Sequence, residues 1–248
     1  MSTEPGETFW EPSVSVVGVG RRGSGIVGAI DTATAANIQT ILSGTEAVSV
    51  ADEVSDYDFC FLTGDLRETS VPDWVSTVLS SSESRTICLL SGTTDRPGEL
   101  LESTNLLVPI RDEVWSESEQ LVSSTVADFF ECMLPPMVEN LGYGDIILST
   151  GSARIASLSV EVDSQIETIL TRGTSIDSPD SVLLFRCAGE RASRDEMYRL
   201  GQRASSRYED TPVLWDQRIH PRYQDKSHVK RFLIAEAERE EREQLLRK

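Results

Sequence analysis

Lysine and histidine are scarce in this chain of 248 residues. It has three lysines among 23 basic residues, two histidines, and 41 acidic residues that bring the net charge to −18. A general nucleic-acid binder and a protein held electrostatically on anionic lipid both need a basic surface, so the charge argues against either function. Acidic excess with little lysine is typical of proteins that work in multimolar salt, where a Debye length of about 3 Å weakens repulsion among carboxylates. We expect a halophilic protein; an acidic protein from a GC-rich genome is the alternative.

Long apolar runs and clustered metal ligands are also missing. No run approaches the roughly 18 apolar residues of a membrane helix, and the acidic residues 1–12 lack the apolar core of a secretory signal. The four cysteines form no CxxC pair, which predicts buried free thiols. Neither His220 nor His228 has a neighbour at metal-ligand spacing, so no metal site is predicted. We expect a cytoplasmic protein without membrane insertion.

Short apolar runs alternate with amphipathic segments from residue 13 onwards, which predicts an α/β fold with a largely parallel sheet. The expected strands cover 13–20, 46–51, 57–63, 85–91, 105–110, 153–162, 182–187, 213–219 and 229–234. The expected helices cover 23–30, 32–42, 71–79, 117–133, 164–172, 193–208 and 236–248.

The strongest local signal is the GxGxxG pattern formed by Gly18, Gly20 and Gly23, at the end of one expected strand and before a helix. Glycines permit close backbone approach, and a helix N-terminus can hold a phosphate. A dinucleotide-binding enzyme would add an acidic residue at the end of the second strand, about 20 residues on. Asp52 lies further along and Glu46 begins its expected strand, so neither fits this pattern well. The dinucleotide-binding reading stays open as an alternative.

An ordered set of motifs resembles the FtsZ/tubulin superfamily, including the CetZ-type members of haloarchaea. VVGVGRRGSGIVGAI (16–30) resembles the family's first glycine loop, DFCFLTG (58–64) the strand before its glycine-rich signature, and NLLVPI (105–110) a later strand. PPMVENLGYGDIILST (135–150) resembles the segment that ends the family's central helix. VLLFRCAGE (182–190) resembles a strand of the family that a helix follows, and residues 213–235 resemble its closing pair of strands. The likeness is collinear over residues 13–235.

This resemblance implies a tubulin/FtsZ-like α/β fold, with a Rossmann-type N-terminal domain joined by a long central helix to a smaller α/β C-terminal domain. The implied organisation is a flexible tail at 1–12, a nucleotide-binding-like domain at 13–112, the central helix at 113–140, the C-terminal domain at 141–235 and a charged terminal helix at 236–248.

The phosphate-binding motifs depart from the family pattern. In the family, signature glycines wrap the phosphates of GTP with backbone N–H groups, but residues 63–70 here read TGDLRETS. Asp65 and Glu68 would repel phosphate, whereas Arg67 would attract it. Two arginines also replace glycines of the first loop, and they either contact phosphate or lie in solvent. If GTP binding is retained, the resemblance implies these binding residues: Gly18, Gly20, Arg21, Arg22, Gly23, Gly64 and Arg67.

The loop after the central helix supplies, in the family, two acids that polarise the attacking water. Asn140 and Asp145 match that pattern and are the candidate catalytic residues, but Gly142 stands where the first acid belongs. Loss of a water-orienting carboxylate costs orders of magnitude in rate. In the alternative reading, Asp145 caps a helix or forms a turn.

The resemblance and its departures together predict a divergent FtsZ/tubulin-like protein. We expect a scaffold, a co-assembling subunit or a regulator in filament-based cell division or cell shape, with weak or lost GTP binding and hydrolysis. Its expected partner is a second copy or an active relative, and GTP is the candidate cofactor. An active polymerising GTPase that uses arginines in place of pocket glycines is the first alternative, and a Rossmann-type dinucleotide-binding enzyme is the second.

Overall fold

The structure is a computed structural model that describes residues 12–30, 38–42, 46–92, 100, 102–110, 119–131, 143–151, 154–162, 168–172, 176–189, 192–219, 223 and 228–236. Its strands are β1 (Val14–Val19), β2 (Ile38–Leu42), β3 (Phe59–Asp65), β4 (Arg85–Ser91), β5 (Leu106–Ile110), β6 (Arg154–Val162), β7 (Ser181–Ala188), β8 (Val213–Ile219) and β9 (His228–Glu236). Its helices are α1 (Gly20–Ala29), α2 (Ala47–Val54), α3 (Val71–Ser81), α6 (Glu119–Glu131), α7 (Tyr143–Ser149) and α8 (Arg194–Arg207).

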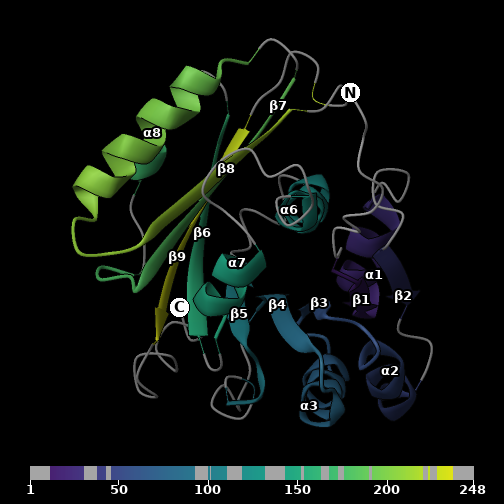
Figure 1. The fold of residues 1–248 in the computed structure, drawn as a ribbon. Helices are drawn as coiled ribbons and strands as arrows, with labels where there is room; N and C mark the ends of the chain where they lie inside the picture. Colours follow the sequence, from purple (N-terminus) through teal and green to yellow (C-terminus); the bar gives the residue numbers. More distant parts are fainter. Residues whose placement is uncertain are drawn as a thin grey trace, which may run out of the picture.

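In these residues the strands form one sheet in the order β2-β1-β3-β4-β5-β6-β9-β7-β8 (Figure 1). The strands from β2 to β6 are parallel, and β9 runs antiparallel between β6 and β7. The residues of β1 and β3 are buried throughout, as expected of parallel strands that are covered on both faces. The α/β fold class predicted from the sequence is confirmed.

Helices cover both faces of the sheet. α1, α6 and α7 pack on one face, and α2, α3 and α8 pack on the other. Phe129 of α6 makes edge-to-face ring contacts with Phe61 of β3, Phe185 of β7 and Phe232 of β9, with centroids 5.2–5.6 Å apart. Because β3 and β7 belong to opposite halves of the sheet, α6 ties the two halves into one apolar core.

Two expected elements near the N-terminus are wrong. Ile38–Leu42 is the strand β2 rather than part of a helix, because its parallel pairing with β1 outweighs local propensity. Residues 47–54 form the helix α2 rather than a strand, with Val50, Ala51 and Val54 buried at helical spacing. Residues 168–170 form one 3₁₀ turn, and the rest of the helix expected at 164–172 lies partly outside the described residues.

The expected central helix at 113–140 is described over Glu119–Glu131 only. Glu236 ends β9, and the remainder of the expected terminal helix lies outside the described residues, as does the tail at 1–11. The division into two domains stays a prediction. None of the helices in the described residues has the length and apolar character needed to cross a membrane.

Candidate functional site at the start of α1

The two predicted phosphate loops lie side by side at the carboxyl ends of β1 and β3. Parallel pairing sets Gly18 of β1 opposite Thr63 of β3, and Val19 opposite Gly64. The first turn of α1 packs so closely on both strands that its backbone contacts theirs. A Cβ at Gly23 would lie 2.3 Å from the carbonyl oxygen of Thr63, so only glycine allows this approach.

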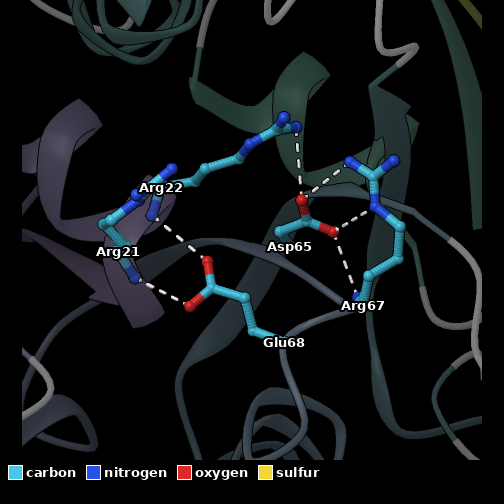
Figure 2. Close-up of polar contacts among 5 residues, drawn as sticks. All are labelled: Arg21, Arg22, Asp65, Arg67 and Glu68. Carbon is cyan, nitrogen blue, oxygen red and sulfur yellow. Dashed lines mark hydrogen bonds and ion pairs between the residues drawn. The ribbon is translucent and has the colours of Figure 1, made fainter.

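The side chain of Glu68 occupies the N-terminus of α1. Glu68 Oε2 accepts a hydrogen bond from the Arg21 N–H at 2.9 Å, and Oε1 accepts one from the Arg22 N–H at 3.3 Å (Figure 2). Gly20 has a positive φ of 69°, and a Cβ there would lie 2.4 Å from Glu68 Oε2. The first N–H groups of a helix lack intrahelical partners and favour a negative charge. Glu68 therefore stands where a helix N-terminus would hold an anion.

Asp65 forms ion pairs with two nearby arginines. Its carboxylate accepts hydrogen bonds from Arg67 Nε at 2.9 Å and Nη2 at 2.8 Å, and Arg22 Nη1 lies 3.2 Å away (Figure 2). The hydrogen bond from Arg67 lowers the pKa of Asp65 below its ordinary value, against the opposing effect of burial. Asp65 is therefore ionised at neutral pH and holds both guanidinium groups.

The structure brings together all seven residues predicted to bind a nucleotide. Gly18, Gly20, Arg21, Arg22 and Gly23 come from the β1–α1 junction, while Gly64 and Arg67 come from the end of β3 and the turn after it. The arginines contact the chain's own carboxylates: Arg22 and Arg67 through their guanidinium groups, and Arg21 through its backbone N–H.

Asp145 lies away from this cluster. It belongs to the short helix α7. Arg85 Nη1 donates hydrogen bonds to the carbonyl oxygens of Ile147 in α7 and of Thr150 directly after it. Arg85 begins β4, whereas the glycine loops follow the ends of the parallel strands β1 and β3. Asp145 and the glycine loops therefore lie at opposite ends of the parallel strands. Asn140 lies outside the described residues.

A second polar cluster, which no sequence pattern predicted, joins α6 to β9. Asp128 of α6 is fully buried and contacts the ammonium group of Lys230, which is also fully buried. His228 Nε2 lies 2.7 Å from Asp128 Oδ2, and the Tyr223 hydroxyl donates to Oδ1. Lys230 Nζ also reaches Ser124 Oγ at 3.0 Å. One signal was available: Lys230 is an ionisable residue near the start of β9, whose later residues Phe232–Ala235 are apolar.

The ligand atoms of Asp128, Cys187 and His228 lie within 4.8 Å of one another, a spacing that a metal ion can bridge. These three groups come from α6, β7 and β9, so spacing along the chain could not reveal them, and the absence of a metal site stays a prediction. The ammonium of Lys230 contacts Asp128 and lies 3.1 Å from His228 Nε2, so a cation already stands between two of the three groups. Cys60 and Cys88, together with Cys187, are buried free thiols as expected, and Cys132 lies outside the described residues.

The acidic residue required for dinucleotide binding has no counterpart at the described second strand. Asp52 is exposed on α2, and Glu46 precedes the same helix. The expected strand that made Asp52 a candidate is not formed. The GxGxxG pattern thus remains without its ribose-binding partner in the described part of the chain.

No family model matches this sequence, and no curated protein matches it. Solved structures do match its fold. An FtsZ dimer from M. jannaschii aligns with a TM-score of 0.73 at 13% identity, covering 92% of this chain and 89% of that one. CetZ2 from Haloferax volcanii, in a GTPγS-bound protofilament, aligns with a TM-score of 0.59 at 12% identity, covering 95% and 97%. TubZ from Bacillus thuringiensis, in GDP-form protofilaments, aligns with a TM-score of 0.58 at 10% identity, covering 94% and 91%. The chain therefore has the FtsZ/tubulin-like fold.

Proposed function

We propose that this protein is an FtsZ/tubulin-like scaffold, co-assembling subunit or regulator of a filament, in which GTP binding and hydrolysis are weak or lost. The observation that carries the proposal is the position of Glu68. Its carboxylate accepts hydrogen bonds from N–H groups in the first turn of α1, the place at which a helix N-terminus would otherwise hold a phosphate.

A nucleotide would meet two obstacles at this position. Glu68 would have to leave the helix N-terminus, and the phosphate would then lie near the ionised Asp65. Two like charges about 4 Å apart repel by about 4 kcal/mol at the effective dielectric of a protein surface. The guanidinium groups of Arg22 and Arg67 lie beside the same carboxylate and offset this repulsion, so the larger obstacle is the displacement of Glu68.

The filament role draws on the solved structures of the same fold. The FtsZ structure is a dimer, and the CetZ2 and TubZ structures are protofilaments. We infer that this chain associates with a second copy or with an active relative in a cytoplasmic filament that serves cell division or cell shape. The net charge of −18 favours a halophilic setting, so assays belong in multimolar KCl.

An active GTPase is the second candidate, and the convergence of Arg22 and Arg67 on one carboxylate favours it. If the side chains of Asp65 and Glu68 moved away together, both guanidinium groups would be placed to donate hydrogen bonds to phosphate oxygens. The two candidates differ in what they predict for the removal of Glu68: the first predicts a gain of binding, whereas the second predicts little change.

The test compares the wild-type chain with Glu68→Ala and with the control Glu83→Ala, which removes an exposed acid after α3. Binding of a fluorescent GTP analogue is measured by anisotropy, and the same samples are sedimented with and without GTP. The proposal predicts no binding by the wild type or the control and measurable binding by Glu68→Ala. Strong binding and nucleotide-dependent sedimentation of the wild type would overturn it in favour of the active GTPase.

A further inference from the structure

Three side chains that can bind a metal ion converge where α6 packs on β7 and β9. Cys187 of β7 and His228 of β9 lie directly opposite each other in the antiparallel pairing, so the sheet makes their side chains neighbours on one face. Asp128 of α6 reaches this pair, and its Oδ2 lies 2.7 Å from His228 Nε2. The ligand atoms of all three residues lie within 4.8 Å of one another. The fold therefore brings a carboxylate, a thiol and an imidazole to one point.

The surrounding core holds these three elements in place. Phe129 follows Asp128 in α6, and its ring makes edge-to-face contacts with phenylalanine rings of β7 and β9. Asp128 and Cys187 are fully buried, whereas the side chain of His228 is 15% exposed. The cluster is thus held on packed elements and reaches solvent at the imidazole, which gives an ion a way in.

We propose that this cluster binds a zinc ion through Asp128, Cys187 and His228, contrary to the sequence-based expectation of no metal. Thiolate, imidazole and carboxylate are ligands of zinc, whereas magnesium and calcium favour oxygen ligands alone. A fourth position falls to water or to the Tyr223 hydroxyl, which already donates to Asp128. Zinc bonds of about 2.0–2.3 Å set tetrahedral ligand atoms about 3.3–3.7 Å apart, so the thiol has to approach by about 1 Å at most.

Lys230 competes with a metal ion for this position. Its ammonium group contacts Asp128 and lies 3.1 Å from His228 Nε2, where it neutralises the carboxylate. On zinc binding, the Cys187 thiol and the Lys230 ammonium each release one proton to solvent, and the Lys230 amine stays beside Ser124 Oγ, now 3.0 Å away. One dipositive ion enters as two protons leave, so the buried cluster is neutral before and after binding. The site uses none of the residues at the start of α1, so the inference stands apart from the proposed function.

The probe is Co²⁺, which accepts the ligands of zinc and gives a near-ultraviolet charge-transfer band only when a thiolate binds it. The wild-type chain is titrated with Co²⁺ in KCl that contains excess Mg²⁺ to occupy surface carboxylates, and Zn²⁺ is then added to displace the cobalt. The variants Cys187→Ser and His228→Gln each remove one ligand. The matched control, Cys88→Ser, removes another buried thiol. Far-UV circular dichroism verifies that each variant is folded.

We expect the wild type and Cys88→Ser to give the same thiolate band, which one equivalent of zinc abolishes. Cys187→Ser should lose the band, and His228→Gln should bind cobalt at least tenfold more weakly. Lys230→Met removes the competing cation, so it should bind cobalt at least tenfold more tightly, and zinc should raise its Tm more than that of the wild type. Three results would overturn the proposal: no thiolate band in the wild type, a band that persists in folded Cys187→Ser, or weaker binding by folded Lys230→Met than by the wild type.

Discussion

Replacement of Lys230 by methionine tests the buried cluster that joins α6 to β9. Both Lys230 and Asp128 are fully buried, and methionine keeps the length of the side chain while removing its charge. The change leaves the Asp128 carboxylate buried without its ammonium partner. Removal of one member of a buried ion pair costs about 3–5 kcal/mol. Because Asp128 keeps contacts with His228 and Tyr223, we expect a loss near the lower end, about 3 kcal/mol.

The assay is guanidinium unfolding followed by circular dichroism, with thermal unfolding in parallel. For a chain of this size about 1 kcal/mol corresponds to roughly 2–4 °C, so Tm should fall by about 6–12 °C. The double variant Asp128→Asn/Lys230→Met should recover much of the loss, because it leaves no unpaired charge. The exposed control Arg194→Met should stay within about 0.5 kcal/mol of wild type. A loss below about 1 kcal/mol for Lys230→Met would refute this account of the cluster.

Other parts of the structure give equally direct predictions. The folded pKa values of Asp65 and Asp128 are depressed, at Asp128 because Lys230 and His228 outweigh the effect of burial. The free energy of unfolding that these two ionised carboxylates contribute is therefore present above the unfolded pKa of about 3.9 and is lost as pH falls below it. A free energy of unfolding that stays constant across this acid range would contradict these shifts. Ser193 caps α8 by accepting the Asp195 N–H, so Ser193→Ala should cost about 1 kcal/mol in the free energy of unfolding, whereas Ser193→Asp should retain the cap. Burial raises the pKa of Cys60 and Cys88 to about 12, so both thiols should react with a disulfide reagent only after unfolding; rapid labelling of native protein would contradict their placement.

The sequence predicted the parts of the fold that local signals specify. Short apolar runs located β1, β3, β4 and β7, and the Ser193 cap located the start of α8. The two errors near the N-terminus have one cause, since short apolar segments do not distinguish a strand from a helix by periodicity. Pairing with β1 makes residues 38–42 a strand, and packing against α3 makes residues 47–54 a helix.

The candidate sites depend on contacts that the sequence does not display. The sequence identified Glu68 as a charge that would repel phosphate, but not that its carboxylate would cap α1, some 47 positions away along the chain. The contact between Asp128 and Lys230 spans 102 positions. Both require two distant segments to be brought together by the sheet. The sequence hints at such a contact only where an ionisable residue, such as Lys230, belongs to a strand that continues as an apolar run.

The most direct test of the central claim is a calorimetric titration of GTP into the folded wild-type protein in multimolar KCl. If the Glu68 carboxylate holds the N-terminus of α1, the titration should give no saturable heat at micromolar protein and nucleotide. A saturable heat with 1:1 stoichiometry would contradict the account, and it would mean that Glu68 yields its place to phosphate.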